Sequence, residues 1–231
     1  MSNKPTSVSI AVDAASRVSG LLLVPDNARA CFVLAHGAGA GMTHPFMDSM
    51  AEGLAVHGVA TLRYQFPYME RGSKRPDPPK LVQATVRAAV AEAARLAPSL
   101  PLFAGGKSFG GRMTSQAHAE LPLPGICGII FLGFPLHAAG KPSADRGAHL
   151  VDVCVPMLFL QGSRDKLADP SILGPLVVQL GPRASLKVFD DADHSFHVPA
   201  RSGRKDADVR AEMLKTIAAW VDTVIAAVAR P

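Results

Sequence analysis

Residues 105–111, GGKSFGG, decide how this sequence is interpreted, because their glycines suit two unrelated kinds of loop. Glycines on both sides of Lys107-Ser108 suggest a phosphate-binding loop. The same letters also match G-x-S-x-G, in which a serine stands on a sharp turn between a strand and a helix. The sequence on either side of the stretch distinguishes the two.

A phosphate-binding loop requires G-x-x-x-x-G-K-[ST], because the residues between the glycines wrap backbone N–H groups around phosphates. A motif of this kind that ends at Ser108 needs glycine at position 101, where the chain has Pro101. Residues 102–104, LFA, resemble a strand and leave no residues to form the loop. The next strand, in GIIFLGF, does not end in an aspartate that could bind magnesium. The sequence therefore disfavours phosphate binding here.

The serine turn agrees better with its surroundings. A strand runs directly into Gly106, Ser108 stands at the apex, and Gly110 and Gly111 open the helical stretch RMTSQAHAE. Small residues two before and two after the serine allow a strained turn to lift the hydroxyl above the sheet. A tight turn with an incidental serine is the alternative, since the five-letter pattern alone is weak. Ser108 is the candidate nucleophile.

Short apolar or β-branched runs alternate with helical patterns along the whole chain. Strands are expected at residues 8–12, 20–24, 30–35, 59–63, 102–105, 127–132, 156–161 and 185–189. Helices are expected at residues 45–57, 80–97, 109–120, 170–180 and 207–229. Strands separated by helices must run parallel, so the pattern predicts one three-layer α/β domain over residues 1–231. Its sheet should be mostly parallel, of about eight strands, with a hairpin-like pair near the N-terminus and helices on both faces.

A serine hydroxyl becomes a good nucleophile only when a base accepts its proton and a carboxylate orients that base. Asp165 follows the strand in VPMLFLQG, and His194 follows the last strand in SLKVFD. Ligands of such sheets bind beyond the carboxyl ends of the strands, where both residues are expected. Asp169 and Asp152 are alternative acids, and His197 is the alternative base.

Acyl chemistry also needs N–H donors for the oxyanion that forms on the substrate carbonyl. One donor is usually the residue after the nucleophile, here Phe109. The other usually comes from the loop after an earlier strand. That loop is HGAGAG, residues 36–41, which makes Ala38 the expected second donor and Gly39 the alternate.

Taken together, these motifs resemble the α/β-hydrolases, and more narrowly a dienelactone-hydrolase-like group that includes the testis-expressed protein thirty and NSL-complex subunit hydrolase-like family. The matching stretches are AHGAGAGMTHPFM, LRYQFPYMERGSKRPDPP, GGKSFGGRMTS, FLGFPLHAAGKP, LQGSRDKLADP and DADHSFHVP, which cover most of residues 31–199. The resemblance implies an α/β-hydrolase fold and assigns nucleophile, acid and base to Ser108, Asp165 and His194. It implies no particular substrate, and some relatives serve as interaction scaffolds.

The sequence departs from dienelactone hydrolases proper in its nucleophile, which is a cysteine in that group and Ser108 here. The resemblance therefore does not extend to lactone chemistry. Larger hydrolases insert a cap domain where this chain has residues 133–153, a stretch long enough only for a short helix. We expect no substantial cap domain.

Composition narrows the remaining possibilities for a chain of 231 residues, 48% hydrophobic and 19% charged. No N-terminal apolar run and no apolar stretch of membrane-spanning length occur. Cys31, Cys127 and Cys154 each lie in an apolar run, which is typical of reduced core thiols and predicts a cytoplasmic location. The formal charge is +5, but the basic residues gather in apparent loops at 71–80 and 201–205, so no nucleic-acid partner is expected.

The sequence thus predicts a serine hydrolase of small or medium carboxylic esters or thioesters that works through an acyl-enzyme. No cofactor is expected, and the HSFH spacing at residues 194–197 has no further ligands nearby to make a metal site. A non-catalytic interaction module with this fold and a peptidase are the alternatives. A homo-oligomer is possible but no sequence feature supports it.

Two further sets of residues are candidates for contact with substrate. The first could line an acyl pocket, although each member could equally pack in the core: Phe46, Phe66, Tyr68, Met69, Phe134, Leu136 and Phe196. The second could hold an ionic network or an anionic substrate group, or could simply face solvent: Arg63, Glu70, Arg71 and Lys107.

Overall fold

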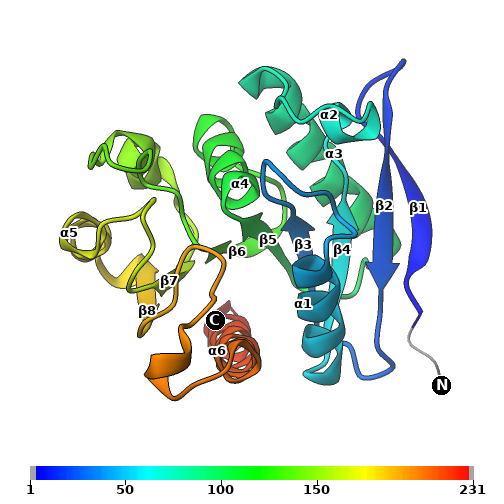
Figure 1. Cartoon of the computed structure of the whole chain (residues 1–231). Coiled ribbons are helices and arrows are strands. Elements are labelled where there is room, and N and C mark those ends of the chain that lie inside the picture. Colours follow the sequence, from blue (N-terminus) through cyan, green and yellow to red (C-terminus); the bar gives the residue numbers. More distant parts are fainter. Residues whose placement is uncertain (1–3, 229–231) are drawn as a thin grey trace.

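A computed structural model describes residues 4–228 and shows an eight-stranded sheet between two layers of helices (Figure 1). The strands are β1 (Thr6–Ala11), β2 (Arg17–Leu23), β3 (Ala30–Ala35), β4 (Val59–Tyr64), β5 (Leu102–Lys107), β6 (Ile126–Leu132), β7 (Met157–Gly162) and β8 (Ala184–Phe189). They lie in the order β1-β2-β4-β3-β5-β6-β7-β8. β2 pairs antiparallel with β1 and β4, and every later neighbour is parallel. The predicted mostly parallel α/β architecture is confirmed.

The helices follow the predicted ranges closely. They are α1 (Pro45–Val56), α2 (Pro67–Glu70), α3 (Pro79–Leu96), α4 (Phe109–Glu120), α5 (Pro170–Leu180) and α6 (Asp206–Val228), with short 3-10 helices η1 (Asp145–Asp152), η2 (Gly181–Arg183) and η3 (Ala200–Ser202). Position 229, where the last helix was expected to end, lies outside the described residues. The sequence did not predict α2, because one helical turn is too short to show a helical period. No described helix is long and apolar enough to cross a membrane.

Each central strand contributes alternate residues to two hydrophobic cores, one on each face of the sheet. Cys31, Val33 and Ala35 of β3 belong to the core under α3, α4 and α5, whereas Phe32 and Leu34 belong to the core under α1 and α6. This alternation follows from the two-residue repeat of a strand. Because both faces are covered, all six residues of β3 are buried and the strand is apolar throughout.

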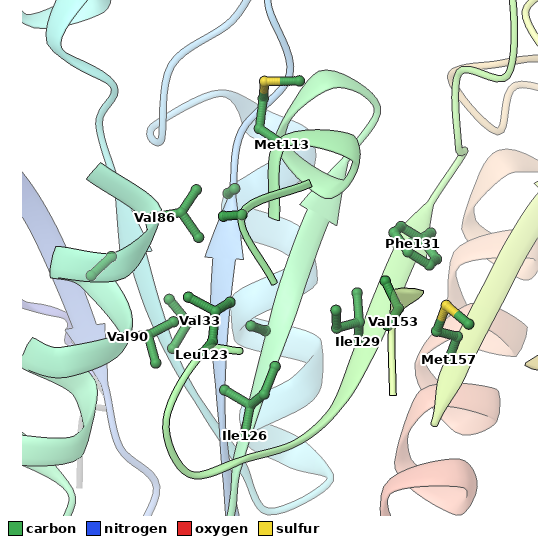
Figure 2. Close-up of a cluster of buried hydrophobic side chains, with 14 of the residues drawn as sticks. Val33, Val86, Val90, Met113, Leu123, Ile126, Ile129, Phe131, Val153 and Met157 are labelled. Carbon is green, nitrogen blue, oxygen red and sulfur yellow. The ribbon is translucent and has the colours of Figure 1, made fainter. Parts of the chain in front are cut away.

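Figure 2 shows part of the first of these cores. Val86 and Val90 of α3 approach Val33 of β3, and Met113 projects from α4. Helix α4 packs on β3, β5 and β6, so it lies over the middle of the sheet. The start of α4 is thereby held at the carboxyl end of β5.

The segment between β6 and β7 is short, as expected from the sequence. Its regular structure consists of η1 and an isolated bridge between Ala138 and Lys141. The carboxyl edge of the sheet therefore carries loops rather than an inserted cap domain.

The turn from β5 to α4 depends on glycine because the backbone is crowded there. Gly106 has φ +153°, and a Cβ on it would lie 2.2 Å from the carbonyl oxygen of Ala35. A Cβ on Gly110 would lie 2.5 Å from the carbonyl oxygen of His36. Real Cβ atoms do not approach oxygen so closely, so both positions require glycine for the strand, the turn and the helix to fit against the end of β3.

We expect Gly106→Ala to lower the free energy of unfolding by about 3 kcal/mol or more, because backbone clash adds to an unfavourable φ. Gly72→Ala is the matched control: Gly72 also has a positive φ, +69°, but a Cβ added there would meet open space. Gly72→Ala should lower the free energy of unfolding by only about 1 kcal/mol. Urea unfolding of both variants measures the difference, and equal losses would show that crowding at Gly106 is unimportant.

Candidate active site

Ser108 lies at the junction of β5 and α4 in a strained backbone conformation. Its φ is +50° and its ψ is −115°, unusual for a residue with a side chain. Its N–H donates to the carbonyl of Leu132 at 3.1 Å, and its carbonyl accepts from the N–H of Arg112 at 3.1 Å. These bonds tie the turn to β6 and to the first turn of α4. The Ser108 side chain is left at the carboxyl edge of the sheet.

The structure brings Ser108, His194 and Asp165 into one line of hydrogen bonds. His194 Nε2 is 2.8 Å from Ser108 Oγ, and His194 Nδ1 is 2.6 Å from Asp165 Oδ2. A carboxylate can only accept, so Nδ1 carries the proton and Nε2 is free to accept one from the serine hydroxyl. The three residues follow β5, β7 and β8, and the parallel sheet places the ends of these strands at one edge.

The carboxylate of Asp165 is buried and held from several sides. Its Oδ1 accepts from the N–H of Leu167 at 2.7 Å, and its Oδ2 accepts from the side-chain amide of Gln161. The amide oxygen of Gln161 in turn accepts from the N–H of Phe134 at 2.9 Å. These donors stabilise the ionised carboxylate and fix its orientation toward His194.

The alternative acid and base residues make other contacts. Asp169 caps α5, accepting from the N–H and the hydroxyl of Ser171. Asp152 lies at the end of η1, which packs against α4 and α5, and it does not line the cavity beside His194. His197 Nδ1 pairs with Asp206 at 2.9 Å near the start of α6, and its side chain is 64% exposed. The hydrogen-bonded arrangement thus involves the acid and base that the sequence favours.

A second serine–histidine contact occurs on α4 but has a different character. Ser115 Oγ is 2.7 Å from His149 Nε2 of η1. Ser115 is fully buried, and burial lowers the pKa of His149 to about 4. The Ser115 hydroxyl is therefore inaccessible to a substrate, which makes this pair a useful control for Ser108.

A cavity of about 410 Å³ opens beside Ser108 and His194. The other lining residues are Gly37, Ala38, Gly39, Ala40, His44, Phe46, Met47, Lys107, Leu167 and Ser195. The cavity surface is mainly apolar, and Ser108 and His194 belong to its wall. Both expected alternatives for the second oxyanion donor, Ala38 and Gly39, border this cavity. Phe109 begins α4, where N–H groups have no acceptor within the helix.

Most of the residues predicted to line an acyl pocket lie elsewhere. Phe46 is the one member of that set on the cavity wall; Phe66, Tyr68, Phe134 and Leu136 are buried in the core under α3 and α4, Met69 packs against that core, and Phe196 stacks on Phe46. Four lining residues outside the predicted 36–41 loop, His44, Met47, Leu167 and Ser195, were not predicted from the sequence. Met47 follows Phe46 and Leu167 follows Asp165 by two, so their nearness to predicted site segments was the available signal.

The alpha/beta hydrolase domain family has a model that matches residues 28–222 of this chain. The chain belongs to this family. The narrower resemblance to the testis-expressed protein thirty group stays a prediction.

Solved structures show the same fold for this α/β-hydrolase. Dienelactone hydrolase from Anabaena variabilis aligns with a TM-score of 0.74 and 21% identity, over 94% of this chain and 97% of that one. A serine hydrolase without a lid from Xanthomonas campestris aligns with a TM-score of 0.72 and 20% identity, over 95% of this chain and 96% of that one. An esterase domain from Rhodothermus marinus aligns with a TM-score of 0.71 and 16% identity, over 94% of this chain and 97% of that one.

Lys107 is the charged residue closest in sequence to Ser108 in this α/β-hydrolase, and it lies on the cavity wall. Its ammonium donates to the carbonyl of His194 and lies over the rings of Phe46 and Phe196, 5.9 and 5.4 Å from their centroids. Burial lowers the pKa of Lys107 to about 8, although Asp165 and Asp193 act in the opposite direction. The ammonium thus links the turn at Ser108 to the loop that carries His194.

The other residues of the predicted ionic set do not join Lys107 in a network. Arg63 pairs with Asp48 and donates to the carbonyl of Met42 at 3.0 Å. Glu70 accepts from the N–H of Ser19, and Arg71 pairs with Asp77. These contacts hold separate loops around the sheet edge.

The lowered pKa of Lys107 predicts a pH dependence of stability. Between about pH 8 and pH 10.5 the unfolded chain binds this proton and the folded chain does not, so the free energy of unfolding should rise with pH through this window. Lys107→Met removes the titration. Urea unfolding of both proteins from pH 7 to 10.5 should show wild type gaining stability relative to the variant above pH 8. A constant difference across that range would contradict the shifted pKa.

Proposed function

We propose that this chain is a serine hydrolase that cleaves carboxylic esters or thioesters of small or medium size. The observation that carries the proposal is the hydrogen-bonded line from Ser108 through His194 to Asp165, whose first two members line an apolar cavity. Family membership supports hydrolysis as the general chemistry.

In the proposed mechanism the Ser108 oxygen attacks the carbonyl carbon of the substrate while His194 Nε2 accepts the serine proton. Asp165 holds the imidazole tautomer and stabilises the imidazolium that forms. The N–H groups of Phe109 and Ala38 donate to the oxyanion. The tetrahedral intermediate collapses, His194 donates the proton to the leaving alcohol or thiol, and the acyl group stays on Ser108. Water then attacks with the help of His194 and releases the acid.

The walls of the cavity support an acyl group of modest size. Phe46, Met47 and Leu167 offer apolar contact, and about 410 Å³ falls in the range common for small-molecule sites. The similar structure from Rhodothermus marinus is named as an esterase domain, which supports ester chemistry for this chain. We propose a small-molecule ester as the partner of this site.

The cellular location belongs to this proposal as well. Cys31, Cys127 and Cys154 are free thiols, Cys31 is buried, and burial raises its pKa to about 12. Cys127 is half-buried and Cys154 is exposed, so of the three only Cys31 is the buried core thiol that the sequence predicts. Free thiols rather than disulfides are typical of a reducing compartment. We propose the cytoplasm.

Labelling with a fluorophosphonate probe tests the nucleophile. Mass spectrometry should locate the adduct on Ser108 in wild type and find none in Ser108→Ala. His194→Ala should label about 10³-fold more slowly or worse, because the hydroxyl loses its base. Ser115→Ala and His197→Ala should label like wild type. If folded wild-type protein forms no adduct, the non-catalytic interaction module becomes the better explanation.

Turnover of matched substrates tests the bond that is cleaved. Short-chain p-nitrophenyl esters should be hydrolysed by wild type, with kcat lower by about 10⁴-fold in Asp165→Asn because His194 then takes the wrong tautomer. The p-nitroanilides of the same acyl groups should react far more slowly. Comparable rates on the anilides would favour the peptidase alternative.

A further inference from the structure

Two side chains, those of His36 and Tyr68, donate hydrogen bonds to two successive backbone carbonyls, those of Gly37 and Ala38. The Gly37 carbonyl accepts a hydrogen bond from the ring of His36 at 2.8 Å, and the Ala38 carbonyl accepts from the hydroxyl of Tyr68 at 3.0 Å. Both contacts lie in the glycine-rich loop that borders the cavity beside Ser108. Neither side chain lines the cavity itself.

The hydrogen bonds of His36 define its tautomer. The N–H of Phe66 donates to Nε2 at 3.0 Å, so Nε2 is unprotonated and Nδ1 carries the proton that is donated to the Gly37 carbonyl. His36 is fully buried, and burial lowers its pKa to about 4. The ring therefore stays neutral near pH 7 and makes both bonds with a single tautomer.

Fixing a carbonyl also fixes the neighbouring N–H. In a trans peptide the N–H points away from the C=O of the same unit, and the described residues contain no cis peptide bond. His36 thus sets the direction of the Ala38 N–H, and Tyr68 sets that of the Gly39 N–H. In the described part of the chain, neither N–H donates to a backbone acceptor. Both residues line the cavity, so each brings an N–H without a backbone acceptor to its wall.

The same aromatic group also contacts Phe109, the residue expected to supply the other oxyanion donor. The ring of Phe109 lies edge-on to Phe66 at 5.7 Å and to Tyr68 at 6.4 Å, and Phe66 in turn lies edge-on to His36 at 4.8 Å. The loop after β3 and the first residue of α4 therefore pack against one rigid cluster. That cluster sets the separation of the two backbone donors.

We propose that His36 and Tyr68 are positioning residues that orient the N–H groups of Ala38 and Gly39 to stabilise the oxyanion. This inference rests on the proposed esterase function and adds to it the side chains that organise the donors. Oxyanion stabilisation requires donors that are already in place. The backbone of this glycine-rich loop gives the Gly37 carbonyl a long hydrogen bond, from the N–H of Ala40 at 3.4 Å. The side chains of His36 and Tyr68 add shorter hydrogen bonds that fix the Gly37 and Ala38 carbonyls.

Tyr68→Phe tests the Ala38 carbonyl contact with little change in packing. We expect kcat for a p-nitrophenyl ester to fall by about 10-fold while KM stays within about twofold, because the lost order affects the transition state more than the bound substrate. Tyr64→Phe is the matched control. It also removes a buried tyrosine hydroxyl, one for which the described residues offer no hydrogen-bond partner, and it should keep the wild-type kcat.

A pair of variants tests the contact of His36. The amide nitrogen of asparagine can occupy the place of Nδ1 and donate to the Gly37 carbonyl, whereas glutamine can place its oxygen near Nε2 and accept from Phe66. The kcat of His36→Asn should stay within about 10-fold of wild type. The kcat of His36→Gln should fall by about 100-fold, which is comparable to the effect of removing one oxyanion donor. A merely structural role for His36 predicts losses of kcat that follow the stability of the two variants. Urea unfolding therefore accompanies the kinetics.

Three results are distinguishable. Selective loss of kcat in Tyr68→Phe and His36→Gln, with the ranking above and folded protein, supports the inference. Wild-type kcat in both folded variants overturns it and leaves the esterase function intact. A wild type that neither hydrolyses esters nor labels with the fluorophosphonate overturns the proposed function, and the inference with it.

Discussion

The close approach of β5 and the first turn of α4 to the end of β3 is the constraint on which the candidate site depends. Gly106 and Gly110 have no side chains, so the backbone of the turn can lie against the carbonyls of Ala35 and His36. This contact places the hydroxyl of Ser108 beside the loop that begins at His36. The candidate nucleophile and the loop of the candidate oxyanion donors are thus neighbours because of backbone packing, before any side chain of the site contributes.

The charged and polar groups of the candidate site, Asp165, His194 and Lys107, each have hydrogen-bond partners within the protein. Asp165 is buried, yet an N–H and an amide donate to its carboxylate, so the cost of burying the charge is offset. His194 is bound between that carboxylate and Ser108 and its side chain is 24% exposed, so a substrate can reach the imidazole. Lys107 anchors the backbone of His194 from the other side. The side chains of the candidate site are therefore tied to residues that follow the strand ends.

Much of the fold and of the candidate site could be predicted from the sequence because the signals are local. Alternating strand and helix patterns define a parallel sheet, and residues just after parallel strands must share one edge. Ser108, Asp165 and His194 could be grouped on that basis, and the structure places them in hydrogen-bond contact. Their catalytic roles stay a prediction.

The walls of the cavity could not be predicted in the same way. Whether an aromatic residue near the sheet edge turns toward the cavity or into the core depends on the loop backbone and on its neighbours in space. Phe66 directly precedes α2 and Tyr68 lies within it. This single turn leaves no periodic signal, and both rings are buried against the loop after β3. Met47 reaches the cavity from the first turn of α1 and Leu167 from the loop after β7, and the sequence pattern does not show which side of either segment faces the cavity.

The partners of each histidine distinguish roles that the sequence alone leaves open. His36 and His137 each accept from a backbone N–H and donate to a backbone carbonyl, so both ring nitrogens are engaged in holding loops. His197 pairs with a carboxylate at the surface. His194 alone among these four contacts both a carboxylate and a serine hydroxyl. A neutral ring whose free nitrogen contacts a hydroxyl can accept a proton during a reaction, whereas one bound on both sides by backbone can only hold position. Whether a histidine can act as a base or only holds a loop in place therefore depends on the partner of each ring nitrogen. Burial alone does not determine it.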